Sequence, residues 1–251
     1  MNIGVYQGAA SLAALERWQD TVSQNIAAAS VPGFRKTEAS FEAVLGDSTK
    51  VGSAGSFTKD AQGVMPHQVE RISMEQGELH MTGGDTDFAI QGSGFFQVQQ
   101  PGGQNGYTRN GGFHISPERT LVTKQGFPVL GDGGPITFNS NGGRISINAD
   151  GNVIQGETQV GKIAVYDFAD PSKLRRVGDG LLAPSDPGVQ PAPVERPSVI
   201  NGAIEGSNVS PLREMVNLVG ISRAFEASQR VIAAHDEATD KAIQSLGNPN
   251  A

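Results

Sequence analysis

A long amphipathic stretch lies near the C-terminus, between Glu205 and Leu246, and it limits the folds open to this chain. Its start is specified chemically, because Ser210 can cap a helix and Pro211 fits the first helical position. Mostly apolar and small residues then recur at alternating spacings of three and four, which is typical of a coiled-coil seam. At 1.5 Å per residue the helix would be about 50 Å long, and a helix of this length needs a partner. The seam positions are Leu218, Ile221, Phe225, Ser228, Ile232, His235, Thr239, Ala242 and Leu246.

A second stretch with the same periodicity opens the chain. Val31 precedes Pro32 and is pushed out of the helical region, and Gly33 completes the predicted end of this helix. Taken alone, the stretch could also be an amphipathic helix buried in a globular domain. With seamed helices at both ends of the chain, we expect each to cover the apolar face of the other. The N-terminal seam positions are Val5, Gly8, Leu12, Leu15, Gln19, Val22, Ile26 and Ala29.

Between Arg71 and Leu182 the hydrophobic period changes to two, which indicates β-strands. Glycine-bearing turns such as Gly102-Gly103 and Asp150-Gly151 separate the strands and suit tight hairpins. Strands and helices do not alternate here, so we expect an antiparallel sheet and no nucleotide-binding fold. The alternating pairs are Phe88 with Ile90, Phe96 with Val98, Phe113 with Ile115, Ile136 with Phe138, Ile145 with Ile147, and Ile163 with Val165.

The predicted fold class is α+β, with long N- and C-terminal helices pairing as a coiled-coil-like element around an inserted antiparallel β-domain. A glycine- and serine-rich run, 46–63, is predicted to be a mobile linker. The expected division is 1–33 for the N-terminal helix, 34–70 for a linker or extended segment, 71–183 for the β-rich domain, 184–204 for a proline-rich strap and 205–251 for the C-terminal helix.

Composition excludes several classes of protein. The formal net charge of −7 argues against a nucleic-acid partner, because phosphate binding needs a basic face. The chain has no cysteine, which excludes disulfides and thiolate metal sites. It has no run of about 18 apolar residues, so no membrane insertion is expected. The N-terminus lacks the basic region of a secretory signal, so any export should not use a cleaved signal peptide.

No catalytic, cofactor or metal site can be predicted from the residues. The four histidines occur singly, without the spacing of a metal site. The segment 92–97 begins like a dinucleotide loop but lacks its third glycine, and 148–152 is better explained as a hairpin turn than as a calcium loop. The carboxylates are scattered among turns, and no serine lies in a G-x-S-x-G elbow. We therefore expect a protein that is not an enzyme.

Three separated regions carry motifs that resemble one known family. Ser23 to Ala27 followed by Pro32-Gly33-Phe34 resembles an N-terminal signature, from which Ala28 and Val31 depart, and Arg35 stands where a lysine is common. The segment 77–98, continued by 107–111 and 121–123, resembles a core segment. Residues 205–209, 214–215 and 223–226 resemble a C-terminal signature, with departures at 222 and 228. The family is that of the flagellar basal-body rod and hook proteins.

Within this family, the chain length and the segment 131–136 most resemble the proximal rod protein, with the distal rod or hook-type subunits as the alternative. The resemblance implies a structural subunit that polymerises into the hollow drive shaft of the flagellum. It also implies export through the flagellar type III apparatus, a place in the rod that crosses the periplasm, and self and other rod proteins as partners. No cofactor is implied.

A second apolar row lies beside the C-terminal seam, at Leu212, Met215, Val216 and Val219. One helix partner cannot cover both rows, so the remaining face is expected to contact neighbouring subunits. The family-motif turn is Pro32, Gly33 and Phe34. The expected interface residues are Val5, Leu12, Leu15, Val22, Asn25, Ile26, Leu212, Met215, Leu218, Val219, Ile221, Phe225 and Ile232.

A secreted carbohydrate-binding or adhesive β-module is the alternative from another functional class. Such a module needs exposed aromatic side chains that stack on sugar rings. The chain has one tryptophan, Trp18, which falls in the predicted first helix, and three tyrosines. The aromatic content therefore disfavours this alternative.

Overall fold

The computed structural model of the chain describes residues 3–45, 64–140, 142–178, 180–186 and 188–247, so the predicted mobile linker 46–63 lies outside the described residues. The chain divides into two compact units. The helical unit comprises Met1–Ile26, Thr37–Arg71 and Ser210–Ala251, and the β-unit comprises Ala27–Lys36 and Ile72–Val209.

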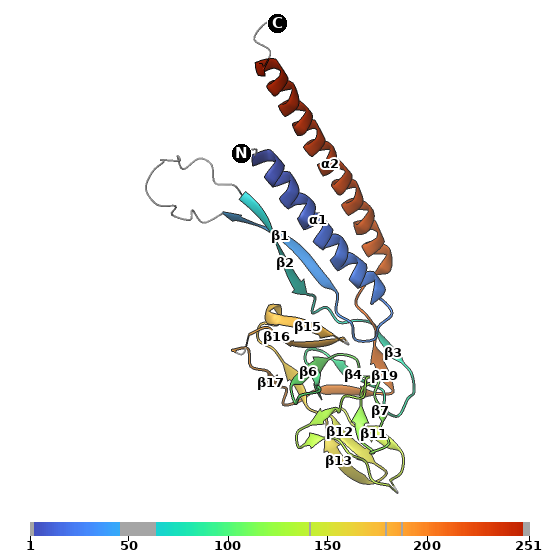
Figure 1. The fold of residues 1–251 in the computed structure, drawn as a ribbon. Helices are drawn as coiled ribbons and strands as arrows, with labels where there is room; N and C mark the ends of the chain where they lie inside the picture. The colour runs from blue at the N-terminus through green and yellow to red at the C-terminus, as the bar shows by residue number, and fades with distance from the viewer. Residues whose placement is uncertain (1–2, 46–63, 141, 179, 187, 248–251) are drawn as a thin grey trace. The chain divides into compact units, whose positions relative to one another are not determined.

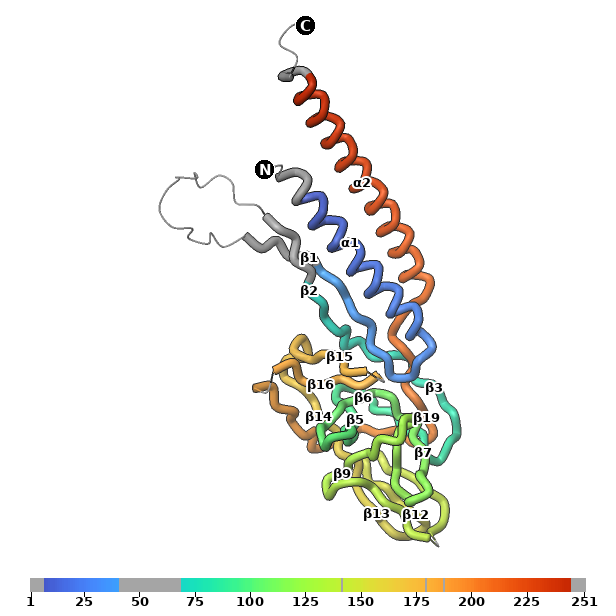
Figure 2. The backbone as a smooth tube through the Cα atoms, in the orientation of Figure 1, coloured from blue at the N-terminus to red at the C-terminus, as the bar shows by residue number. Residues whose placement is uncertain are grey.

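The helical unit contains the two long helices α1 (Ile3–Ala27) and α2 (Pro211–Gly247), together with a two-stranded sheet formed by β1 (Thr37–Leu45) and β2 (Val64–Ile72). The helices lie side by side and run in opposite directions (Figures 1 and 2). The second helix begins at Pro211 as predicted, and the Ser210 carbonyl accepts the first helical hydrogen bond from the Glu214 amide at 3.0 Å. The α+β class is thus confirmed, while coiled-coil pairing of the helices stays a prediction.

The β-unit is built around a six-stranded sheet in the order β15-β16-β6-β5-β14-β17. Its strands pair antiparallel, as the absence of strand–helix alternation predicted. A 3₁₀ turn, η1 (Pro171–Lys173), precedes β15. The strands are β5 (Phe95–Gln99), β6 (Asn105–Thr108), β14 (Val165–Asp167), β15 (Leu174–Gly178), β16 (Leu181–Pro184) and β17 (Ala192–Pro193).

Smaller antiparallel sheets complete the β-unit. One has three strands, β11 (Ile145–Ile147), β12 (Asn152–Gln155) and β13 (Thr158–Lys162). Four have two strands each: β3 (Leu79–Met81) with β19 (Ala203–Glu205), β4 (Phe88–Gln91) with β18 (Ser198–Asn201), β7 (His114–Ile115) with β8 (Leu121–Val122), and β9 (Leu130–Gly131) with β10 (Gly134–Pro135).

The period-two residues form the core of the β-unit, because alternate side chains of a strand point to the same face. Eleven of the twelve predicted positions lie in one buried apolar cluster, including Phe88, Phe96 and Ile163. The exception is Ile115, which is 39% exposed. It lies in β7, a strand of only two residues that pairs with β8 alone. A strand this short does not place both alternating residues in the core.

Strands occur in the segment 34–70, predicted as a linker or extended segment, and in the segment 184–204, predicted as a proline-rich strap. The first contains β1 and most of β2, which ends at Ile72; each strand is nine residues long. The predicted strap 184–204 contributes β17, β18 and β19, which pair with β14, β4 and β3. Prolines in this segment pointed away from strands, but Pro193 lies in β17 at the edge of its sheet, where the missing amide hydrogen breaks no central ladder.

Candidate assembly surface

The predicted seam of α2 faces the interior of the helical unit over its first half. Ile221 is 1% exposed, and Leu218, Phe225, Ser228 and Ile232 are partly buried. Beyond Ile232 the seam positions His235 and Ala242 are exposed, and the side chain of Leu246 lies outside the described residues. The seam therefore covers apolar surface inside the subunit up to Ile232, and little beyond it.

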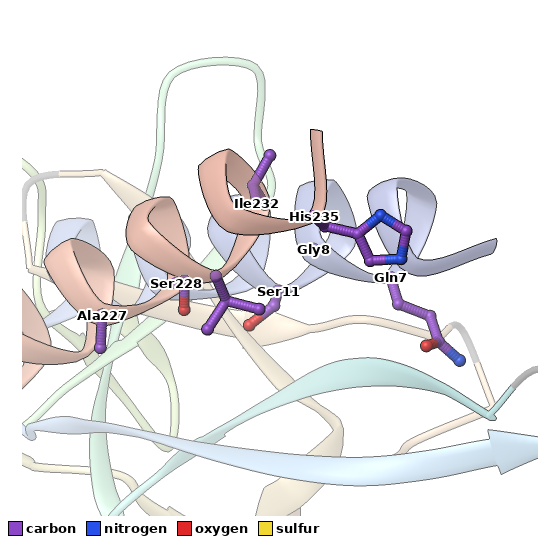
Figure 3. Close-up of a pocket in the computed structure, with 8 residues that line it drawn as sticks. Gln7, Gly8, Ser11, Ala227, Ser228, Ile232 and His235 are labelled. Atoms are coloured by element: carbon purple, nitrogen blue, oxygen red, sulfur yellow. The ribbon is translucent and has the colours of Figure 1, made fainter. Parts of the chain in front are cut away.

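The two helices lie close together at Gly8 of α1 and Ile232 of α2. A methyl group added to Gly8 would come within 2.6 Å of Ile232 Cγ1, so a larger residue here would require the Ile232 side chain to shift. Beside this contact the helices leave a groove of about 420 Å³ (Figure 3). The groove is lined by Gln7, Gly8 and Ser11 of α1 and by Ala227, Ser228, Val231, Ile232 and His235 of α2.

The predicted interface residues of α1 fall on its sheltered side. Val22 is buried, and Leu12, Leu15 and Ile26 are partly buried. The side chain of Val5 lies outside the described residues. These side chains are thus already in contact with the subunit's own residues, whatever further contacts assembly adds.

Asn25 serves an internal contact that sequence reasoning did not anticipate. Its side chain is 2% exposed. The amide nitrogen donates to the Thr37 carbonyl at 2.8 Å, and the amide oxygen accepts from the Thr37 amide at 2.9 Å. One turn earlier, the Thr21 hydroxyl donates to Glu70 at 3.1 Å. These bonds fasten the last turns of α1 to β1 and β2, because an amide side chain can pair with a peptide group as a neighbouring strand would.

The second apolar row of α2 is exposed in the subunit. Leu212, Met215, Val216 and Val219 are 75%, 51%, 65% and 54% exposed, and their spacings of three and four place them along one stripe. Val231 and Ile243, farther along the helix, are also exposed. Large apolar side chains that face water along one stripe are typical of interaction surfaces, because single-chain proteins rarely leave such stripes uncovered.

In the β-unit, the predicted motif turn docks against the C-terminal signature. Gly33 adopts a left-handed conformation with a φ of 68°, and its amide donates to the Glu205 carbonyl at 2.7 Å. Phe34 is buried, and the guanidinium of Arg176, from β15, lies over its ring at 4.1 Å from the centroid. A cation over an aromatic face is attractive, so Arg176 of β15 adds a contact to the turn besides the hydrogen bond from Gly33 to Glu205.

The adjoining Arg35 enters a buried group of three charges, which we call the charge junction. It consists of Arg35, Arg109 and Glu205. The Arg35 Nη2 lies 2.8 Å from Glu205 Oε1, and the Arg109 Nη1 lies 3.1 Å from Glu205 Oε2. All three side chains are 3% exposed or less. The N-terminal, core and C-terminal motif regions therefore meet at one carboxylate.

Burial shapes the titration of the arginines around this junction. It lowers the pKa of Arg109 to about 10; the Glu205 carboxylate opposes the shift, and the Arg35 cation adds to it. Burial likewise lowers the pKa of Arg35, again against the pull of Glu205, and it lowers the pKa of Arg176. A guanidinium with a pKa near 10 is still protonated at neutral pH. The junction therefore contains two cations, and the Glu205 carboxylate partly offsets their charge.

Within the described ranges, no group of three or more His, Asp or Glu side chains is placed to hold a metal ion. No described helix is long and apolar enough to cross a membrane. The features that stand out in these parts of the chain are surfaces and joints between segments rather than converging reactive groups.

Two protein-family models match the chain. The flagellar hook protein FlgE/F/G D1 domain matches residues 89–155, which lie in the β-unit. The flagellar basal body rod FlgEFG protein C-terminal region matches residues 200–245, from β18 to near the end of α2. The second match includes both Glu205 and the exposed apolar row.

Several relatives align with most or all of the chain. A flagellar basal-body rod protein FlgF from Rhizobium meliloti is 37% identical over 98% of this chain and 99% of its own length. A FlgF protein from Caulobacter vibrioides is 36% identical, with 100% of both chains covered. A flagellar basal-body rod protein FlgG from Buchnera aphidicola (subspecies Acyrthosiphon pisum) is 33% identical over 89% of this chain and 92% of its own length.

Proposed function

The chain belongs to the flagellar basal-body rod protein family, and from this premise we propose that it polymerises through its terminal helices into the wall of the rod. It is a structural subunit of the flagellar basal body, and assembly with other rod and hook components follows from the family. What needs an explanation is which surfaces of this subunit carry the polymer contacts.

The exposed row of α2 is the observation that carries the proposal. The seam side of α2 is already covered within the subunit at Ile221, whereas Leu212 and Val219 face water. A contact between two different surfaces of identical subunits does not close on itself, so its repetition generates a helical filament. The row on each subunit then supplies the apolar area that a neighbouring subunit buries.

Among the rod proteins, the share of the chain that aligns with each relative favours the FlgF type. This type corresponds to the sequence-based expectation of a proximal rod subunit. FlgF relatives align over 98–100% of this chain at 31–37% identity in three examples. FlgG relatives reach 30–33% identity but align over 88–90% of it. The distal rod type is the second candidate, because the identity values of the two groups overlap.

Export and location complete the proposal. A subunit of the rod has to cross the inner membrane, and membership of the rod protein family leads us to expect passage through the flagellar type III apparatus. Its final place would be the rod that spans the periplasm, in contact with copies of itself and with proximal and distal rod proteins.

Two variant pairs test the assembly surface. Val216→Asp with Val219→Asp places charges on the exposed row, so we expect a folded subunit that neither polymerises nor restores swimming, since burying an unpaired carboxylate is strongly unfavourable. Leu218→Asp with Phe225→Asp places charges in the seam and should also weaken the subunit itself. Polymer is measured by electron microscopy, motility in cells lacking the native protein, and folding by circular dichroism.

A matched control places a charge elsewhere on the surface. Thr158→Glu, at an exposed position of β13, should leave the fold unchanged. The proposal fails if the row variant assembles and swims as well as the unmodified protein. Binding of the purified subunit to glycans without any polymer formation would favour the adhesive alternative instead.

A further inference from the structure

The charge junction is unbalanced, because two guanidinium groups share one carboxylate. In the described parts of the chain, Glu205 is the one carboxylate in ion-pair contact with Arg35 or Arg109. The Nε atoms of both arginines are buried and have no hydrogen-bond partner. The pair of arginines depends strongly on the Glu205 carboxylate, because removing it would leave two buried cations close together without an anion in contact.

Arg109 is held firmly by the β-unit. Its guanidinium donates to the carbonyl of Ile90 in β4 and to the carbonyl of Gly92 just after this strand, and it lies 5.3 Å from the centroid of the Phe95 ring. Glu205 Oε1 also accepts from the Gly77 amide at 3.0 Å. The core of the β-unit thus fixes one cation and, through it, the position of the carboxylate.

The second cation arrives on a short segment from the N-terminal side. The segment Ala27–Lys36 is tied to the C-terminal signature by the bonds from Gly33 to the Glu205 carbonyl and from the Asn208 amide to the Phe34 carbonyl. The Lys36 amide adds a bond to the Asn208 side chain at 2.6 Å. Further bonds join the Ser73 amide to the Lys36 carbonyl at 2.9 Å, the Arg176 guanidinium to the Arg35 carbonyl at 2.7 Å, and the Arg35 guanidinium to the Met74 carbonyl at 3.2 Å. The Arg35–Glu205 pair is the contact between opposite charges among these bonds.

We propose that Glu205 is a positioning residue that locks the N-terminal motif turn onto the β-unit. Burial of the Arg35 cation requires a carboxylate beside it. The Glu205 carboxylate is held in that position by Arg109 and by the Gly77 amide. Docking of Ala27–Lys36 and ordering of residues 203–209 are therefore one event. The lock rests on contacts inside the β-unit and does not depend on the assembly proposal.

Hydrogen exchange on the full-length protein tests the lock. In Glu205→Gln we expect the amides of Gly33, Lys36 and Ser73 to exchange at least about 100-fold faster, because breaking a buried ion pair is strongly destabilising. The amides between β5 and β6, which lie in the core sheet, should change by less than about threefold. A uniform acceleration at all these amides, or no change at Gly33, would overturn the proposal.

A matched control removes a carboxylate from an exposed ion pair. Asp85→Asn breaks the contact with Arg144, whose side chain is 74% exposed. We expect no measurable change at Gly33 in this variant, because exposed pairs contribute little. Acceleration at Gly33 equal to that of Glu205→Gln would show that the effect comes from lost charge in general and not from the lock.

A double-mutant cycle measures the coupling itself. Arg35→Met leaves one ion pair without net charge, Arg109 with Glu205. The increase in the exchange rate of the Ser73 amide caused by Glu205→Gln should therefore be at least tenfold smaller in the Arg35→Met background than in the unmodified protein. If Glu205→Gln does not fold, Glu205→Asp withdraws the charge by one methylene group and gives the same cycle. Additive effects would contradict the lock.

Discussion

Gly33 occupies a backbone position that a side chain strongly disfavours. Its φ of 68° is left-handed, and a methyl group built on it would overlap the backbone nitrogen of Asn110 and the carbonyl carbon of Arg109. Backbone atoms cannot rotate away as a side chain can. The glycine therefore meets two requirements at once, a turn of unusual hand and a close approach to the loop that carries Arg109.

Gly33→Ala should lower the free energy of unfolding by more than about 2 kcal/mol, since strain and overlap add. Gly126→Ala is the matched control, because Gly126 has a φ of 87° and no atom lies within 4 Å of an added methyl group. It should cost only about 1 kcal/mol. Calorimetry of the full-length variants compares the two. Equal losses would mean that the close approach to Asn110 contributes nothing.

Single residues also show where sequence reasoning stopped. Pro32, Gly33 and Phe34 could be predicted as a turn, because proline and glycine restrict the backbone locally. The pairing of Arg35 with Glu205 could not, since it joins residues far apart in the chain and no spacing rule connects them. The available signal was weak: both charged residues lie within motif segments, and buried charges need a partner.

Asn25 illustrates how one residue joins two elements. Its amide pairs with both backbone groups of Thr37 and so fastens α1 to the start of β1. Periodicity placed the residue on the sheltered side of the helix, but periodicity does not distinguish a contact within the subunit from one between subunits. The structure assigns its hydrogen bonds to the subunit.

Asn25→Asp should loosen the attachment of β1 to α1. A carboxylate keeps the shape but cannot donate to the Thr37 carbonyl, so one hydrogen bond is lost and a charge is buried. We expect a loss of about 1–3 kcal/mol. Thermal unfolding followed by circular dichroism measures it. Gln24→Glu makes the same chemical change at the exposed neighbouring position and should have little effect; a comparable loss in that control would contradict the role of Asn25.

Helices and strands could be predicted where neighbouring residues in the sequence specify them. The start of α2 at Pro211 and the core strands around Phe88 and Phe96 follow from capping and period-two alternation, which depend on near neighbours. The strands β17, β18 and β19 did not follow from the sequence. Prolines surround them, and they exist because β14, β4 and β3 offer free edges, which is a long-range property.

On the scale of the whole subunit, α2 is covered unevenly. Up to Ile232 it has sheltered positions at Leu218, Ile221 and Phe225, but from 233 to 244 only Thr239 is partly covered. A helix in water is marginal without packing, because its nucleation is unfavourable and propagation adds little per residue. The second half of α2 is thus less buried within the subunit than the first half, and we expect a neighbouring molecule to stabilise it.

Amide exchange should report this division. In the free subunit we expect the amides of 233–244 to exchange at least about tenfold faster than those of 218–228, because few buried contacts resist local opening. In assembled rods the two segments should become similarly slow, since a neighbour would then supply the missing cover. Mass spectrometry of both states makes the comparison. Strong protection of 233–244 in the free subunit would mean that this part of α2 is stable without a neighbouring molecule, and would contradict the prediction.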